Sequence, residues 1–240
     1  MFKTIVWILN TKIAMAHTET VDRILDAAEI LFAEKGFAET SLRSITSKAK
    51  VNLAAVNYHF GSKNALIQAV FNRFLSPLND LMVAGMRANR WGEKGGNVPT
   101  IEDIIRLYTR SLLKIPTRHE NGVSIFMRLL GLAYTQSQGH LRKYLEDEYA
   151  QTFWPFLSLV KRITPELSSK ERFWRTQFLL GSMAFTMSSI QQLTDILENK
   201  AGSTPNPEQV VDFLVPFLAA GLSAPPANPL ASVTVSSVVT

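Results

Sequence analysis

A chain of 240 residues, 46% of them hydrophobic, is long enough to bury one large core or two small ones. Its net charge of +5 and isoelectric point of about 9.5 are compatible with a nucleic-acid partner. The absence of cysteine excludes a disulfide framework, a thiol nucleophile and a cysteine-ligated zinc site, and no apolar run approaches the roughly 20 residues that a membrane span needs.

The segment 1–17 precedes the first regular pattern. Its residues 5–9 are apolar, but Asn10 and Lys12 interrupt the run before it reaches the roughly 7–15 apolar residues of a secretory h-region. Met15 directly precedes the patterned region, which fits an alternative start. We therefore predict that residues 1–17 are a disordered extension, and we place the cysteine-free chain in the reducing cytoplasm, with no membrane partner.

The first long helix is predicted over residues 19–35. Apolar side chains recur along it at helical spacing, namely Val21, Ile24, Leu25, Ala28, Leu31 and Phe32. Thr18 or Thr20 can cap its start and Gly36 can stop it. We interpret it as a core-forming support helix whose N-terminal end, near Thr20, can also meet a DNA phosphate.

Two short helices joined by a tight turn are predicted within residues 40–63. The first, over 42–49, places Leu42, Ile45 and Ala49 on one face. Asn52 is a favourable cap for the second, over 53–59. This arrangement indicates a helix-turn-helix, whose second helix enters the DNA major groove.

The chemistry of this region agrees with DNA binding. No Asp or Glu occurs between Thr40 and Phe74, which suits a phosphate backbone. Asn can pair with adenine and Ala can contact a thymine methyl, so we expect Ala54, Ala55 and Asn57 to face bases. The predicted DNA-binding set is Thr20, Ser41, Arg43, Asn52, Ala54, Ala55, Asn57, Tyr58, His59 and Lys63. The alternative is a plain helical hairpin with a solvated basic face.

The order of residues resembles the DNA-binding domain of the TetR family of bacterial repressors. The resemblance lies in ILDAAEILFAEKGFAETSLRSI at 24–45 and KAKVNLAAVNYHFGSKNALIQAVF at 48–71, with a Gly-Phe turn, a Thr-Ser pair and an aromatic-rich recognition helix. Lys50 stands where the family usually has glycine. Within the family, the sequence of this segment is most similar to the PsrA-type, fatty-acid-responsive branch.

The rest of the chain is predicted to be helical. A fourth helix over 62–90 contains Pro77 and is followed by a Gly- and Pro-containing loop at 91–100. Further helices are predicted over 101–115, 123–134, 140–163, 168–199 and 207–222. No segment alternates with period two, so we predict an all-α fold: a helix-turn-helix domain over 18–64, a helical ligand-binding and dimerisation domain over 65–222, and a disordered tail over 223–240.

The last two predicted helices carry more apolar surface than one side of an edge helix needs. We predict that Phe185, Phe213 and Phe217 lie in or beside a subunit interface. Packing within one subunit is the alternative. The family resemblance implies that the last two helices of two subunits pair in a four-helix bundle, and such a dimer presents two recognition helices to a palindromic operator.

Motifs for catalysis are absent from the sequence. The four histidines form no metal-binding i, i+4 pair, and there is no HExxH motif, nucleophile elbow or phosphate-binding loop. Asp22 with Asp26, and the acidic residues at 146–148, are interpreted as solvated helix faces rather than acid/base pairs. We therefore predict no enzyme, no cofactor and no metal.

The family resemblance implies an apolar effector cavity that controls DNA release, and the closer branch implies a long-chain fatty acid or acyl-CoA. Arg128 has apolar neighbours, so it reaches solvent, pairs with Glu120 or Glu148, or binds an anionic head group. The predicted ligand set is Phe126, Arg128, Leu130, Tyr134, Phe153 and Phe178. The function predicted is a homodimeric repressor released by such an effector; the alternatives are an efflux regulator that responds to aromatic or cationic compounds, and a regulator that answers to a protein.

Overall fold

The structure is a computed structural model that describes residues 2–136, 139–202 and 204–227, apart from the side chains of 2–17, 142 and 148–153. Within these residues helices are the only regular secondary structure, which confirms the all-α prediction, and no helix is long and apolar enough to cross a bilayer. The helices are α1 (Phe2–Glu39), α2 (Leu42–Ala49), α3 (Leu53–Phe60), α4 (Lys63–Ala88), α5 (Ile101–Leu113), α6 (Gly122–Thr135), α7 (Gly139–Ile163), α8 (Ser169–Ser188), α9 (Ile190–Ala201) and α10 (Pro207–Ser223). The predicted tail lies beyond the described residues from 228 onward.

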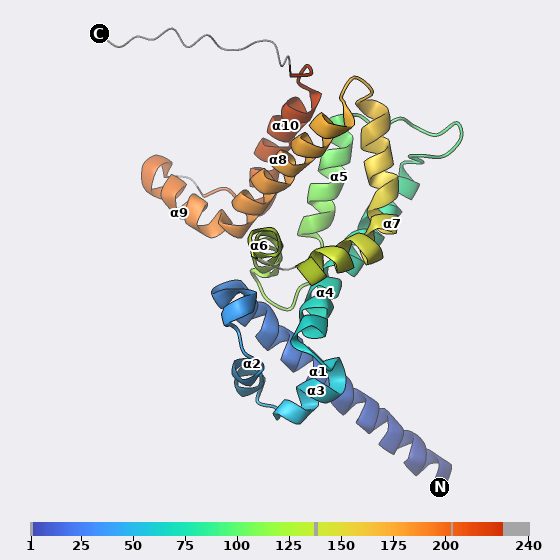
Figure 1. The fold of residues 1–240 in the computed structure, drawn as a ribbon, viewed down its shortest axis with the longest axis vertical. Coiled ribbons are helices and arrows are strands. Elements are labelled where there is room, and N and C mark those ends of the chain that lie inside the picture. Colours follow the sequence, from blue (N-terminus) through green and yellow to red (C-terminus); the bar gives the residue numbers. More distant parts are fainter. Residues whose placement is uncertain (1, 137–138, 203, 228–240) are drawn as a thin grey trace.

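One long helix, α4, joins two groups of helices (Figure 1). Helices α1–α3 and the start of α4 form one end, while α5–α10 form the body at the other end. Helix α6 lies against the end of α1, and the two are in extensive contact. A single apolar core runs through both groups, from Phe32 of α1 through Phe71 of α4 and Phe126 of α6 to Val215 of α10. Packed side chains therefore connect the body to the N-terminal helices without a break.

Helix α1 differs from the prediction at its start and agrees with it at its end. The backbone of residues 2–17 is helical, where we predicted a disordered extension. Neither glycine nor proline occurs between Phe2 and Lys35, so nothing local stops the helix from extending toward the N-terminus. At the other end Gly36 has φ 84° and ψ 169°, and it interrupts the helix at the predicted position.

Local capping fixes the helix-turn-helix. Asn52 Oδ1 accepts a hydrogen bond from Ala55 N at 2.8 Å, which confirms the predicted cap of α3. Ser41 Oγ caps α2 in the same way, accepting from Ser44 N at 3.0 Å. Between the two helices Lys50 has the left-handed φ of 54° and ψ of 47°, which explains why glycine is usual at this position of TetR-like sequences.

The predicted helix over 168–199 is divided in the structure into α8 and α9. The break falls at Ser188 and Ser189, without glycine or proline. The hydroxyl of Ser188 donates to Phe185 O at 3.2 Å, and the hydroxyl of Ser124 donates to Ser188 O at 3.0 Å. Serine hydroxyls that bond to the backbone compete with the helical ladder, and the bond from Ser124 depends on tertiary packing.

Candidate nucleic-acid interface and effector cavity

The outer face of α3 is open to solvent while its inner face is anchored. Val56 is fully buried in the same core cluster as Ile45 of α2, so the two short helices are held together by apolar packing. The exposed side chains of α3 are Leu53, Ala54, Asn57 and Tyr58, and the half-buried ones include Ala55 and His59. Small residues near the start of α3 leave room for its backbone to approach base edges.

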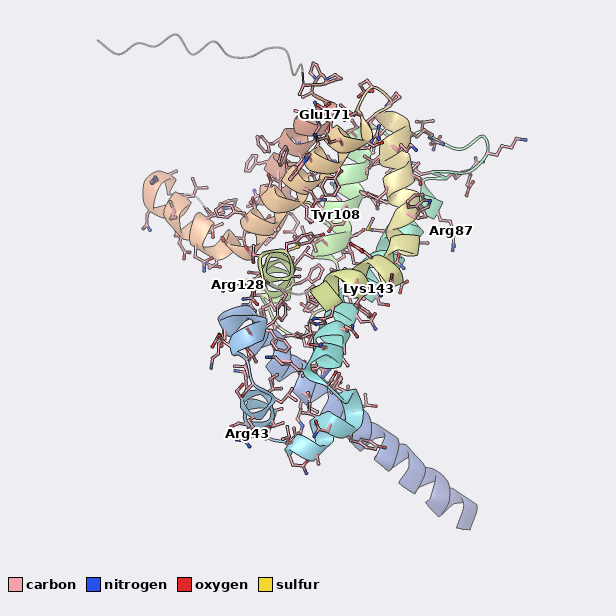
Figure 2. All side chains as sticks on the ribbon, viewed as in Figure 1. Arg43, Arg87, Tyr108, Arg128, Lys143 and Glu171 are labelled. Atoms are coloured by element: carbon pink, nitrogen blue, oxygen red, sulfur yellow. The ribbon has the colours of Figure 1, made fainter. Side chains whose placement is uncertain are left out.

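The residues predicted to contact phosphates surround this face. Arg43 of α2 is exposed and points away from the body (Figure 2). Ser41 and Asn52 use a side-chain oxygen for capping. Thr20 is half-buried and lies well inside α1, so the prediction that it stands at the N-terminal end of this helix is wrong. Lys63 Nζ donates to Ala38 O at 3.2 Å, which ties α4 to the end of α1 and leaves two N–H groups for a phosphate.

Thr40 is a site residue that the sequence did not indicate. Its side chain is fully buried, and its hydroxyl lies 2.8 Å from Gly36 O and 3.0 Å from Leu31 O. These bonds hold the turn between α1 and α2 against α1. A threonine directly after a glycine-interrupted helix is consistent with this role, but the carbonyl groups that it contacts become known only from the three-dimensional structure.

A charged cluster joins α1 to α4, which corrects the interpretation of the α1 carboxylates as solvated. Arg73 of α4 lies 2.8 Å from Asp26, 2.9 Å from Glu29 and 3.8 Å from Asp22. Arg118, in the loop before α6, lies 3.2 Å from Asp22 and 3.4 Å from Asp26. The guanidinium groups thus connect α1 both to α4 and to the start of α6.

Glu29 is the buried member of this cluster, with a side chain only 3% exposed. Burial raises the pKa of Glu29 to about 7, although the guanidinium of Arg73 opposes the rise. His119 Nε2 lies 3.6 Å from Glu29 Oε2 and has no hydrogen-bond partner among the described residues. With Glu29 protonated, the two remaining carboxylates balance the two guanidinium groups. Asp26, Glu29 and His119 also lie close enough to ligate a metal ion, but Arg73 already contacts two of them, so we assign none.

The raised pKa of Glu29 predicts a specific dependence of stability on pH. Because the folded-state pKa of about 7 exceeds the ordinary value of 4.5, the folded protein binds more protons between these values. The free energy of unfolding should therefore fall as pH rises from about 5 to about 7, by on the order of 1–3 kcal/mol for this group. Glu29→Gln should flatten this slope in urea denaturation, whereas Glu34→Gln, at an exposed position of the same helix, should not. Equal slopes for all three proteins would contradict the prediction.

An apolar cavity of about 390 Å³ lies in the body among α4, α5, α6, α7, α8 and α10. Its size is typical of small-molecule sites, which span roughly 300–1,000 Å³. Its apolar lining comprises Leu75, Ile104, Ile105, Phe126, Leu130, Leu145, Phe156, Leu157, Val160, Leu179, Leu180, Met183 and Leu222. Polar groups come from Tyr108, Tyr134, Glu146, Thr176 and Gln177.

The structure brings three of the six predicted ligand residues to this cavity. Phe126, Leu130 and Tyr134 follow one another at intervals of four on α6 and line it. Arg128 lies on the exposed side of α6 and is not in the lining, so the solvent-reaching alternative describes it (Figure 2). Phe178 is also exposed and outside the lining, since its neighbour Leu179 takes the inward position. The side chain of Phe153 lies outside the described residues.

The charge of the cavity is set by few groups. Among the described lining residues Glu146 alone carries a full charge, and its side chain is exposed. Burial raises the pKa of the Tyr108 phenol to about 12, so this phenol stays neutral and can donate a hydrogen bond within the cavity. The described lining therefore offers no cation for a ligand carboxylate.

Exposed aromatic side chains form an aromatic surface on α8 and α10. Its members are half or more exposed, and all belong to α8 or α10: Phe173, Trp174, Phe178, Phe185, Phe213 and Phe217. Trp174 stacks on Phe178 with ring centroids 6.1 Å apart. The residues predicted for the interface, Phe185, Phe213 and Phe217, thus lie exposed on two packed helices. Large contiguous apolar surfaces of this kind mark interaction sites.

Comparison with protein families gives two matches. The model of bacterial regulatory proteins of the tetR family matches residues 24–70, and the model of the tetracyclin repressor-like C-terminal domain matches residues 106–221. The HTH-type transcriptional repressor Rv3405c of Mycobacterium tuberculosis is 41% identical over 71 residues, which are 30% of this chain and 38% of that protein. The probable HTH-type transcriptional regulator YttP of Bacillus subtilis is 40% identical over 55 residues, 23% of this chain and 27% of that protein. The chain thus matches less than half the length of these relatives.

Solved structures share this fold at low sequence identity. A TetR-like transcriptional regulator from Rhodococcus sp. RHA1 aligns with a TM-score of 0.54 and 17% identity over 85% of this chain and 96% of that one. The fatty acid degradation regulator FadR from Bacillus halodurans aligns with a TM-score of 0.53 and 15% identity over 83% of this chain and 98% of that one. At these identities the likeness establishes the fold alone.

Proposed function

We propose that this chain, which belongs to the TetR family of bacterial regulatory proteins, is a homodimeric transcriptional repressor that binds a palindromic operator and releases it when an apolar effector enters the body. The observation that carries the proposal is the exposed outer face of α3, anchored by Val56 and connected through α4 to a helical body with an apolar cavity.

The operator proposal assigns separate roles to bases and phosphates. We assign exposed Ala54 and Asn57 to base edges; Ala55 is half-buried and less accessible to a base. Arg43 and Tyr58 are exposed beside them and suit phosphate oxygens. The acid-free stretch from Thr40 to Phe74 removes repulsion from the DNA backbone.

A binding experiment with two variants tests these roles. Asn57→Ala should relax preference at one base pair of each half-site, by about 1–3 kcal/mol, because its amide can no longer pair with an adenine. Arg43→Gln should weaken all sequences alike and reduce the salt slope of log K by about 1. Selection of bound duplexes from a random pool measures the base preference of each protein. The affinity for a selected duplex, measured at several salt concentrations, gives the salt slope. If Asn57→Ala selected the same sequences as the wild type with equal stringency, the base-reading role would be wrong.

The effector proposal is an elongated apolar molecule in the cavity, and a long-chain fatty acid or acyl-CoA is its first candidate. The apolar lining suits an acyl chain. Its head group would remain at the mouth beside the exposed Tyr134 and Glu146, because the described lining holds no cation and Arg128 points elsewhere. The sequence resemblance to the fatty-acid-responsive branch supports this candidate, and the solved FadR contributes only its fold.

One observation favours a second candidate, an aromatic or cationic compound of the kind that efflux regulators detect. Glu146 is the charged group of the described lining, and a carboxylate attracts a ligand cation while repelling a ligand carboxylate. The aromatic side chains of Tyr108 and Phe156 add surfaces on which a cation can stack. Ligands that share one chain but differ in their head group distinguish the two candidates.

A further inference from the structure

A polar contact joins the end of α6 to the turn that follows α1. Gln136 is the C-cap residue of α6, and its Oε1 accepts a hydrogen bond from Phe37 N at 3.1 Å. Its amide nitrogen fills the space beside Gly36, where a Cβ would collide with it. Both α1 residues are buried, and Gln136 is half-buried. A residue of the helical body therefore contacts the N-terminal helices directly, although Gln136 and Phe37 are 99 positions apart in the sequence.

The turn that Gln136 contacts determines the position of the helix-turn-helix. Gly36 O accepts from the buried Thr40 hydroxyl, and Thr40 directly precedes the cap of α2. The ring of Phe37 packs against Phe71 of α4 with centroids 6.2 Å apart. A displacement of this turn therefore shifts α2, and α3 with it, relative to α1.

The same helix that ends at Gln136 also lines the effector cavity. Tyr134 is two residues before Gln136, and Leu130 and Phe126 follow on the same face. A ligand that moves this face of α6 must move its C-terminal end or strain the helix. If the bond to Phe37 breaks, a buried N–H loses its partner, and this penalty favours two discrete arrangements over a continuous drift.

We propose that Gln136 is a positioning residue that couples the cavity to the turn between α1 and α2, a direct connection from α6 to α1 in addition to the shared helix α4. The inference rests on the proposed function for its biological meaning, but the physical coupling can be measured without an operator. A bound ligand acts through this contact to the extent that it binds more tightly to the state in which the contact is altered.

The test combines a cavity probe with hydrogen exchange on the full-length protein. The probe is N-phenyl-1-naphthylamine, a neutral apolar dye, and the readout is amide exchange of the peptide that contains Phe37. In wild type, saturating dye should change exchange at this peptide at least tenfold. Gln136→Met removes the acceptor at similar volume, so exchange should be fast with or without dye. Gln136→Glu keeps an acceptor oxygen and should restore the response.

Several outcomes separate this inference from the repressor proposal. Saturating dye without any change at the Phe37 peptide in wild type would overturn the coupling, as would a normal dye response in Gln136→Met. Failure of the dye to bind would overturn the cavity and the coupling together. A dye response at Phe37 that is lost in Gln136→Met, with no effect of dye on binding to selected duplexes, would uphold the coupling and refute ligand-controlled DNA release.

Discussion

Phe217→Glu is expected to abolish the dimer and, with it, tight operator binding. Phe217 is 69% exposed in the single chain, so a glutamate there costs the isolated subunit little. In a subunit interface the same glutamate would be an unpaired buried charge, which costs several kcal/mol. That cost raises the dimer dissociation constant by at least 10³-fold. Since each subunit supplies one recognition helix, the monomer also loses the half-site pairing that a palindrome requires.

The matched control is Val98→Glu, because Val98 is also 69% exposed but lies in the loop between α4 and α5. Sedimentation equilibrium over a range of concentrations measures both variants against wild type. Phe217→Glu should be monomeric, or unfolded if no stable monomer exists, while Val98→Glu remains dimeric. A Phe217→Glu protein with the dimer dissociation constant of Val98→Glu would remove the aromatic surface of α10 from the proposed interface.

The elements that the sequence predicted well are those with local determinants. Gly36 and the caps Ser41 and Asn52 act within a few residues, and they define the ends of α1, α2 and α3. The break between α8 and α9 lacks such a signal, because it depends on Ser124, 64 residues away from Ser188. Residues 1–17 were predicted as disordered because their apolar run is short and they precede the patterned region, although they contain no glycine or proline to interrupt a helix.

Side-chain direction was the least predictable feature of the candidate site. Helix α8 is apolar on more than one side, so periodicity alone did not decide that Leu179 faces the cavity and Phe178 faces solvent. Arg128 was included in the ligand set as one of three alternatives because its sequence neighbours are apolar, yet Phe126 and Leu130 take the inward positions on α6. The contacts of Arg73 with the α1 carboxylates, like that of Gln136 with Phe37, link residues far apart in the sequence.

Leu130→Trp is expected to give a repressor that binds DNA normally but no longer responds to its effector. Leu130 is a buried residue of the cavity wall, and an indole in its place would occupy much of the 390 Å³ available to a ligand. Effector affinity should fall at least 100-fold, equivalent to about 2.7 kcal/mol. Operator affinity should remain within about threefold, because α3 lies in the other helical group. Arg128→Trp, on the exposed side of the same helix, is the matched control.

Head-group chemistry is tested in the same experiment with oleate, oleyl alcohol and oleylamine, which share one chain. If a fatty acid is the effector, oleate binds most tightly and Arg128→Met leaves its affinity unchanged, because Arg128 points away from the cavity. If the second candidate is right, oleylamine binds most tightly, and Glu146→Gln removes its advantage over the alcohol, since the attraction comes from the Glu146 carboxylate. Equal affinities for the three ligands would mean that the cavity recognises the chain alone. Unchanged binding of all three in Leu130→Trp would place the effector outside this cavity, and the proposed route of release through α6 would then be wrong.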